Sequence, residues 1–393
     1  MAQSDTVTIP PEVAGRPTLA PATRLTALDV LRGITVAFMI LVNNNGDWQR
    51  AYAPLKHAQW NGFTPTDLVF PAFLFVMGTS MVFSFESRLS RGVARASLFF
   101  HTLRRAVILF LLGLVVNGFP FFNLNTLRIY GVLQRIALCY LLVGIFYLLD
   151  HGIASKVFMF SACLLGYWAV LRWVPVPGYG MPTRDVPLLD PSGNLVAFLD
   201  RHIFPGRLFE GVRDPEGLLS TLPALGTTLM GVLAGYWLRS QRSVGKKVLG
   251  LISCGLVGLL LGALWGQWFP INKKMWTSSY VLFAGGWTLL ALAACYWIIE
   301  IKGWKRWWTY PWLVFGTNAI VAYVFSELLA ATFYTVPVHV GYRVLELQRW
   351  IFLRFFALMH NLGFASLCYS VAFTVVCFLP ITILYHKKIF IKV

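Results

Sequence analysis

The stretch Arg50–Ser80 reads RAYAPLKHAQWNGFTPTDLVFPAFLFVMGTS, and it joins a polar segment to a long apolar run that begins at Leu68. The polar segment holds a single histidine, His57, close to the point where the chain enters an apolar phase. An imidazole titrates near neutral pH and can transfer protons, whereas a simple connector needs only turn residues. The stretch therefore predicts a membrane-spanning helix with a candidate active site at its start.

The composition places the chain among integral membrane proteins. Of its 393 residues, 57% are hydrophobic and only 12% are charged, whereas soluble domains carry about 25% charged residues. Apolar stretches of about 20 residues recur along the chain, and each is long enough to cross a hydrocarbon core of about 30 Å. We therefore predict an all-α, polytopic membrane protein.

The formal net charge of +17 would suggest nucleic-acid binding in a soluble protein. Here the Lys and Arg residues gather in short segments between apolar runs, which the positive-inside rule explains more simply. We expect no nucleic-acid partner. The six cysteines lie inside apolar runs without a CxxC pair, so we interpret them as core residues and expect neither disulfides nor a metal.

About ten membrane spans are predicted, and the charge bias places both termini in the cytoplasm and His57 outside. Residues 1–24 are expected to form a disordered cytoplasmic tail, and residues 25–393 a single transmembrane domain with a long periplasmic loop at 175–218. An amphipathic helix at 349–360 is expected to lie at the membrane interface. The predicted spans are 25–44, 65–85, 106–122, 128–148, a fifth ending near 174, 219–238, 248–269, 278–299, 308–329 and 362–385.

Polar groups inside a span are costly to bury and mark candidate sites. Arg135 lies within the fourth span, where it would bind an anion or pair with an acid such as Glu327 or Asp29. Asn318 lies in the middle of the ninth span, where an amide serves a binding site or joins two helices. Asp29 and Arg32 lie one turn apart on the first span, a spacing that favours a simple ion pair.

Two interpretations are open for the residues around the point where the chain enters the second predicted span. His57 has no His or Cys partner at metal-ligand spacing, so it is an interfacial side chain or a proton-transfer group. The sequence TPTD at 64–67 is typical of a helix start, with Thr64 as N-cap and Asp67 at the capping-box position. The sequence DPEG at 214–217 has the same character. Such starts need no catalysis to explain them.

Six segments, taken in order, extend over nearly the whole chain and carry a family resemblance. They are RLTALDVLRGITVAFMILVNN (24–44), KHAQWNGFTPTDLVFP (56–71), LRIYGVLQRIALCY (127–140), DPEGLLST (214–221), INKKMWTSSYVLF (271–283) and GTNAIVAYVFSE (316–327). Together they resemble the heparan-α-glucosaminide N-acetyltransferase family of transmembrane acyltransferases. Several ordered motifs of this length are a far more specific signal than one short pattern.

The resemblance implies an enzyme that takes acetyl-CoA from the cytosolic side and acetylates a terminal glucosamine on the other side. It places the catalytic histidine on His57 and a functional asparagine on Asn43, which would donate to the developing oxyanion or orient the imidazole. Whether acetyl passes directly or through an acetyl-histidine stays open. The candidate residues are His57, Asn43 and Asp67 for catalysis, Arg32, Arg135 and Asn318 for the cofactor, and Trp60, Asn61 and Glu327 for the acceptor.

The lysosomal members carry a luminal domain before the first span, and the polar segment in that position is short here. We therefore expect a bacterial inner-membrane enzyme that acts on a periplasmic amino sugar or glycan, and the family implies a homodimer. The alternative is a proton-coupled transporter of a sugar or organic anion, with Arg135 as anion site and His57 with Asp67 as proton relay. Paired broken helices, which mark many transporters, are not evident. A structural membrane subunit would leave the intramembrane polar groups unexplained.

Overall fold

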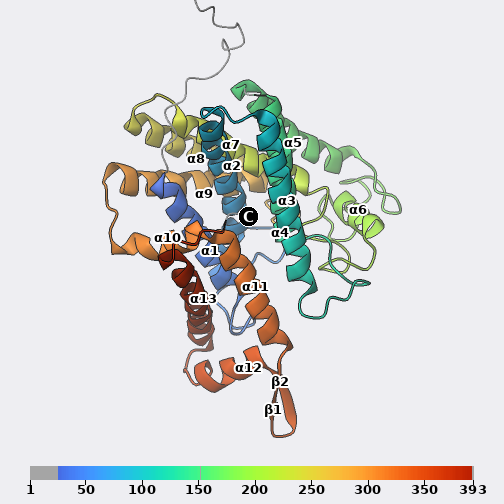
Figure 1. Cartoon of the computed structure of the whole chain (residues 1–393). Helices are drawn as coiled ribbons and strands as arrows, with labels where there is room; N and C mark the ends of the chain where they lie inside the picture. The colour runs from blue at the N-terminus through green and yellow to red at the C-terminus, as the bar shows by residue number, and fades with distance from the viewer. Residues whose placement is uncertain (1–24, 151, 392–393) are drawn as a thin grey trace, which may run out of the picture.

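The computed structural model describes residues 25–150 and 152–391, and within these ranges helices supply nearly all of the regular secondary structure (Figure 1). The tail predicted at 1–24 lies outside the described residues. The helices are α1 (Thr26–Asn43), α2 (Val69–Leu89), α3 (Arg95–Gly118), α4 (Val132–Leu149), α5 (Ile153–Trp173), α6 (Leu195–Ile203), α7 (Thr221–Arg239), α8 (Val244–Trp265), α9 (Ser278–Tyr296), α10 (Tyr310–Thr317), α11 (Ala319–Thr335), α12 (Leu347–Ile351) and α13 (Leu362–His386).

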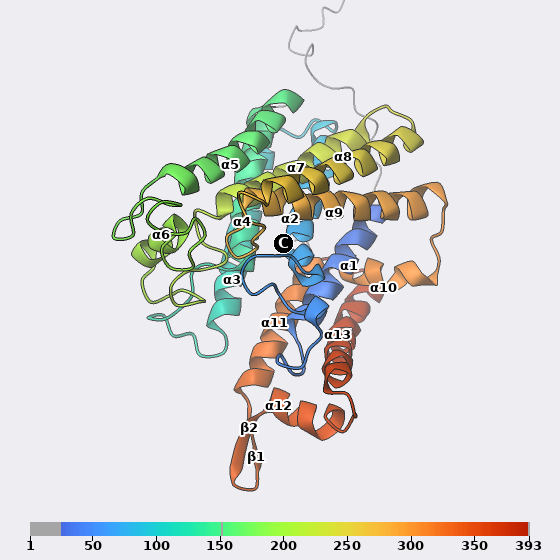
Figure 2. The ribbon, with the colours of Figure 1, turned by 180° about the vertical axis from the view of Figure 1, so that it is seen from behind.

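Shorter elements complete this inventory. Single helical turns are η2 (Ala53–Leu55), η3 (Pro65–Leu68), η4 (Trp297–Ile301), η5 (Trp307–Thr309) and η6 (Phe352–Phe356). Strands β1 (Pro337–Val340) and β2 (Arg343–Glu346) pair antiparallel into a hairpin. The hairpin projects from one end of the molecule, beside α12 (Figure 2).

Membrane-spanning helices make up most of the fold, as predicted. In the described ranges, nine helices are long and apolar enough to cross a membrane, and the bent pair α10–α11 makes up to ten. The all-α, polytopic fold class is therefore confirmed. The side of the membrane on which each terminus lies stays a prediction.

Three predicted boundaries are wrong in an informative way. Helix α3 begins at Arg95 rather than near 106, because its basic first turns continue the helix beyond its apolar part. The ninth span is broken, since α10 and α11 meet at Asn318 with a bend of 77°. The interfacial helix covers 347–356 instead of 349–360, and α6 and the β-hairpin have no counterpart in the sequence-based prediction.

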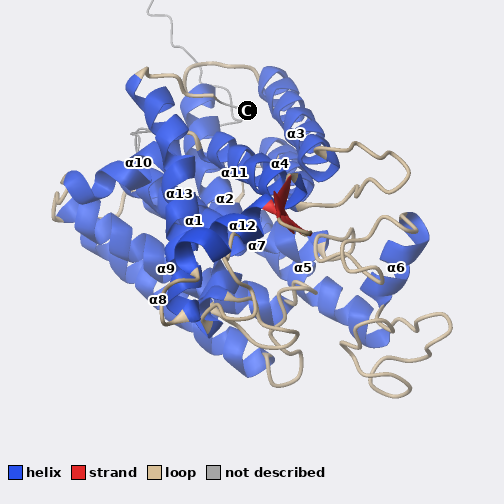
Figure 3. Ribbon diagram, turned by 90° about the horizontal axis from the view of Figure 1, so that it is seen from below, coloured by secondary structure: helices blue, strands red, loops and turns tan. Residues whose placement is uncertain are grey.

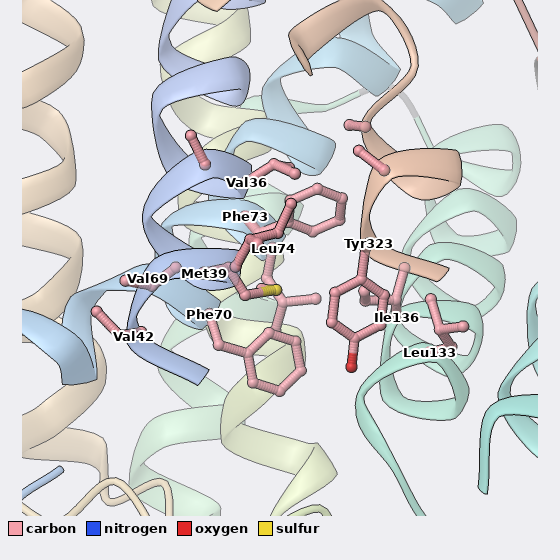
Figure 4. Close-up of a cluster of buried hydrophobic side chains, with 14 of the residues drawn as sticks. Val36, Met39, Val42, Val69, Phe70, Phe73, Leu74, Leu133, Ile136 and Tyr323 are labelled. Atoms are coloured by element: carbon pink, nitrogen blue, oxygen red, sulfur yellow. The ribbon is translucent and has the colours of Figure 1, made fainter. Parts of the chain in front are cut away.

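Helix α2 lies at the centre of the bundle, packed against α1 on one side and α7 on the other. The pairs α8–α9, α3–α4, α1–α10 and α5–α7 also make extensive contacts, and Figure 3 shows α8 and α9 at the edge of the bundle away from α3. A buried apolar cluster joins α1, α2, α4 and α11 (Figure 4). Its labelled members are Val36, Met39, Val42, Val69, Phe70, Phe73, Leu74, Leu133, Ile136 and Tyr323.

Reciprocal glycines allow α2 and α7 to approach each other closely. A Cβ at Gly78 would overlap the backbone oxygen of Thr228, and a Cβ at Gly231 would overlap that of Phe75. The hydroxyl of Thr79 donates to the carbonyl of Gly231 at 2.9 Å across the same contact. Small residues and interhelical hydrogen bonds are the usual means by which helices associate inside a membrane.

The connections that follow α1, α3, α5 and α8 meet at one end of the bundle, which we call the site end. Trp60 from the first of these donates its indole N–H to Leu189 of the third, at 2.9 Å. The amide of Gly62 donates to Ile271 of the fourth, at 2.8 Å. Segments far apart in the sequence therefore converge on the stretch that surrounds His57.

Replacing Gly231 with alanine is expected to destabilise the protein by roughly 1–3 kcal/mol, because the added methyl group overpacks the α2–α7 contact. The matched control is Gly166→Ala on α5, where an added Cβ meets nothing within 4 Å. Thermal unfolding in detergent should show a lower midpoint for the first variant only. Equal midpoints would contradict the close packing.

Candidate active site

Hydrogen bonds from two other connections hold the segment around His57 in place. Trp60 is tied to Leu189 of the long 175–218 loop, as described above. The side-chain oxygen of Asn61 accepts a hydrogen bond from Asn272 Nδ2 at 3.1 Å. Asn272 is fully buried, so its amide gives Asn61 a fixed partner. The predicted acceptor residues Trp60 and Asn61 therefore lie together, between the two loops.

Asp67 serves both interpretations that the sequence left open, with a different oxygen for each. Its Oδ1 lies 2.7 Å from Nδ1 of His57. Its Oδ2 accepts from the amides of Ala58 at 3.1 Å and Thr64 at 3.0 Å, and from the Thr64 hydroxyl at 3.0 Å. The predicted capping box is thus confirmed. Asp67 is fully buried, and the hydroxyl of Tyr280 donates to its backbone oxygen at 2.7 Å.

Lys273 is the third member of this group, and the sequence analysis did not select it. Its Nζ lies 3.1 Å from Nδ1 and 3.0 Å from Nε2 of His57. Burial lowers the pKa of His57 below its usual value, and the Lys273 charge lowers it further, against the opposite effect of the Asp67 carboxylate. The imidazole is therefore neutral at pH 7. About a third of its side chain, 36%, is exposed, so a substrate can reach it.

A second charged network lies at the site end, on the long loop. Arg128 binds Asp214 through two hydrogen bonds, of 2.8 and 2.6 Å, and Glu216 through a third of 2.6 Å. The sequence DPEG at 214–217 therefore forms a turn whose acids hold an arginine, and the predicted helix begins later, at Thr221. Asp200 accepts from the amide of Asp214 at 3.0 Å. Burial and the nearby Asp214 charge raise the pKa of Asp200 to about 6.

Arg135 is buried, with only 1% of its surface exposed. Its guanidinium donates to Gly217 O at 3.0 Å and to the hydroxyl of Ser220, and it lies 5.0 Å from the centre of the Trp276 ring. Neither acid proposed as its partner, Glu327 or Asp29, takes that role. Its Nε and one terminal nitrogen have no hydrogen-bond partner among the described residues. The group therefore has donors left for an anion.

Asn43 faces a different partner from the one expected. Its Nδ2 donates to Oε1 of Glu327 at 3.4 Å and so joins α1 to α11. Among the described residues, Asp67 rather than Asn43 contacts the ring of His57. The catalytic role predicted for Asn43 stays a prediction. Asn43 and Glu327, predicted separately for catalysis and for acceptor binding, form one pair.

Arg32 lies far along α1 from Asn43, eleven residues or about 16 Å of helix rise. It pairs with Asp29 at 3.3 Å, as predicted. It also donates to Gly316 O of α10 at 3.1 Å and to Ser80 Oγ of α2 at 2.7 Å. These contacts tie three helices together and place Arg32 away from His57.

Asn318 occupies the break between α10 and α11 and is buried, with 1% exposed. Its Nδ2 donates to Ile389 O at 3.1 Å, and its Oδ1 accepts from the amide of Ile391 at 3.0 Å. The amide therefore anchors the segment that follows α13. Its predicted role in cofactor binding stays a prediction.

A groove of about 450 Å³ opens beside the His57 segment. Trp268 is 72% exposed there, and Arg213 lies over the Trp60 ring at 4.0 Å. The groove therefore combines aromatic surfaces with amide and carboxyl groups. It is lined by Trp60, Asn61, residues 187–191, Gln267, Trp268 and Pro270.

The sequence carried weak signals for the residues that were missed. Lys273 and Lys274 stand together in a short connection predicted to lie outside, where the positive-inside rule disfavours Lys. Arg128 likewise stands at the predicted outer end of the fourth span. A Lys or Arg on the side that the positive-inside rule disfavours indicates that another interaction needs its charge at that position. In both places that interaction is with acids or with His57.

Comparisons with known proteins agree on one family. The family model described as heparan-alpha-glucosaminide N-acetyltransferase, catalytic, matches residues 24–253. The heparan-alpha-glucosaminide N-acetyltransferase of Homo sapiens is 30% identical over 78% of this chain and 53% of its own length. That of Mus musculus is 29% identical, over 78% and 54%. The chain thus spans about half the length of the curated relatives it matches.

Replacing Arg128 with methionine is expected to destabilise the fold by about 3–5 kcal/mol, because Asp214 is left buried without its partner. The matched control is Arg184→Met, which breaks an exposed pair with Asp185 and should leave the unfolding midpoint nearly unchanged. Thermal unfolding in detergent compares the two. A small effect at Arg128 would mean that water replaces the ion pair.

Proposed function

Because this chain belongs to the heparan-alpha-glucosaminide N-acetyltransferase family, we propose that it transfers acetyl from acetyl-CoA to the amine of a glucosamine-type sugar. The observation that carries the proposal is the His57–Asp67 pair. It offers a partly exposed, neutral imidazole, which is what thioester aminolysis needs from a base, and His57 lies three residues before Trp60 of the groove.

Asp67 fixes which nitrogen reacts. A carboxylate only accepts hydrogen bonds, so Nδ1 of His57 carries the proton and Nε2 carries the lone pair. In direct transfer, Nε2 takes a proton from the amine as the amine attacks the thioester carbonyl. The intermediate then expels the CoA thiolate, which receives that proton. In the alternative, Nε2 attacks the carbonyl first and displaces the CoA thiolate. The amine then attacks the acetyl-imidazole, the bond between Nε2 and the acetyl carbon breaks, and the proton lost by the amine passes to the thiolate.

The acceptor is proposed to bind in the groove beside Trp60 and Asn61. A sugar ring has apolar faces and polar edges, and a pocket with aromatic walls and a few amides suits both. Asn43 and Glu327 remain candidates for orienting the acceptor or the oxyanion, acting as a pair.

The anionic donor is proposed to use Arg135, whose buried guanidinium keeps unpaired donors. Guanidinium groups bind phosphate oxygens strongly. Arg32 and Asn318 are kept as cofactor candidates of lower priority, because their polar groups already serve contacts within the protein. We further propose entry of acetyl-CoA from the cytosol, acetylation in the periplasm across a bacterial inner membrane, and a homodimer.

A proton-coupled transporter is the second candidate function. The observation that favours it is the broken span α10–α11, with its 77° bend at Asn318. Transporters of this type usually carry such breaks in pairs, in corresponding halves. Among the described residues one bent pair is found, so the enzyme remains the preferred function.

Transfer of labelled acetyl from acetyl-CoA to glucosamine by the purified protein tests the enzyme directly. His57→Ala should reduce the rate by at least about 10²-fold, because the imidazole supplies the base. His339→Ala is the matched control, since His339 is exposed on strand β1 of the β-hairpin. Size-exclusion chromatography checks that both variants fold.

Each other outcome of this assay has a definite meaning. Equal transfer by wild type and His57→Ala would keep the enzyme and remove His57 as its base. Absence of both transfer and acetyl-CoA binding in the wild type, together with counterflow of free sugar in proteoliposomes, would establish the transporter instead.

Trp268→Ala tests the groove. We expect KM for the sugar to rise roughly tenfold with kcat little changed, because a lost aromatic contact weakens binding by about 1.4 kcal/mol. Trp307→Ala is the control, since that indole is 85% exposed on the connection before α10. A fall in kcat without a change in KM would place the acceptor elsewhere.

A point substitution is preferable to shortening the 175–218 loop, which would also disturb Asp214 and Glu216.

A further inference from the structure

Two adjacent lysines in the connection between α8 and α9 point to different partners. Lys274 forms an ion pair with Glu210 of the long loop, with Nζ and Oε1 2.9 Å apart. Lys273 instead lies against His57, within 3.1 Å of both ring nitrogens. A loop ion pair explains the first lysine. The position of the second brings a cation against a group that must itself accept a proton.

The backbone around Lys273 is fixed by a tight turn. Asn272 Oδ1 accepts from the amide of Met275 at 2.9 Å, and the amide of Thr277 donates to Asn272 O at 3.1 Å. Asn272, Met275 and Thr277 are fully buried. Lys273 therefore starts from a rigid position, and its side chain is held toward His57.

Charges from four elements surround the Lys273 ammonium. Burial lowers the pKa of Lys273, and the carboxylates of Asp67 and Glu216 act in the opposite direction. Lys274 and Arg135 lower it further. Two acids close to the ammonium favour its charged form. The His57 ring therefore contacts a carboxylate at Nδ1 and a cation that lies within 3.1 Å of both ring nitrogens.

We propose that Lys273 is a positioning residue that keeps the imidazole of His57 neutral, so that Nε2 is ready to take a proton from the acceptor amine. This inference rests on the proposed function. Asp67 alone would stabilise the imidazolium, because an opposite charge favours the charged form. The Lys273 ammonium lies 3.0 Å from Nε2, where it donates toward the lone pair. Its charge opposes a second positive charge on the ring and so offsets this effect of Asp67.

The same repulsion assists the second half of the reaction. Once Nε2 has taken the proton of the amine, the imidazolium lies beside an ammonium and is a stronger acid than an isolated one. It therefore passes the proton readily to the departing CoA thiolate. The proton moves from amine to imidazole to thiolate, and Lys273 keeps its own proton throughout.

The test measures the protonation of His57 without relying on acetyl transfer. Diethyl pyrocarbonate reacts with neutral imidazole, and peptide mass spectrometry reads its rate at His57 between pH 5 and 8, with the exposed His339 as internal reference. In Lys273→Met, modification of His57 at pH 5.5 should slow roughly three- to tenfold. Lys273→Arg keeps the charge and Lys274→Met removes the neighbouring one, and both should follow the wild type.

The pH dependence of kcat/KM tests the same change in the protonation of His57. Because the pKa of His57 is lowered in the wild type, the acid limb of kcat/KM should lie below pH 6.5, the ordinary value for histidine, and should move to higher pH in Lys273→Met. Lys273→Gln is a second neutral variant, and its profile should shift in the same way.

Several results would overturn the inference. An unchanged His57 modification profile in a folded neutral variant would do so, even if activity were lost. Failure of both neutral variants to fold while Lys273→Arg folds would assign Lys273 a purely structural role. If the modification profile shifts between the wild type and Lys273→Met but the wild type transfers no acetyl, the proposed function is rejected. The effect of Lys273 on His57 is then retained.

Discussion

One buried carboxylate, that of Asp67, determines both how the chain enters the bundle and how the imidazole is presented. Burying a charge is costly unless its lone pairs are satisfied. Here two backbone amides, one hydroxyl and the ring of His57 satisfy them. One oxygen caps the helix start and the other binds the ring. The position of the imidazole is therefore fixed by the rigid start of α2 rather than by a loose loop.

The packing of α2 against its neighbours also positions the rest of the site. The reciprocal contacts at Gly78 and Gly231 fix α7 against α2, and α7 follows directly on the loop that carries Asp214. The lengths of the apolar segments predict most of these helices, since the ability to span a hydrocarbon core is a property of each segment by itself. The break at Asn318 was not predictable in that way, because its amide is satisfied by a segment more than 70 residues further along the chain.

The site was predictable to the extent that it is local. His57 and Asp67 are ten residues apart, and their motif contains both the cap and the pair. Lys273 lies 216 residues from His57, and no periodicity relates the two. Arg135 was identified as costly to bury, but its partners were not, because it donates to the backbone of Gly217 rather than to an acid. Asn43 was placed on the right helix end, yet its partner is set by how α11 packs.

In the proposed function, the opposite charges around His57 address a problem that any partly buried base faces. A carboxylate is the best group for orienting an imidazole, but in a medium of low dielectric it also favours the protonated ring strongly. A protonated ring is no base. A cation beside the same ring offsets that tendency, while Nδ1 keeps its 2.7 Å contact with Asp67. The arrangement thus separates orientation, which Asp67 supplies, from protonation state, which burial and Lys273 set together.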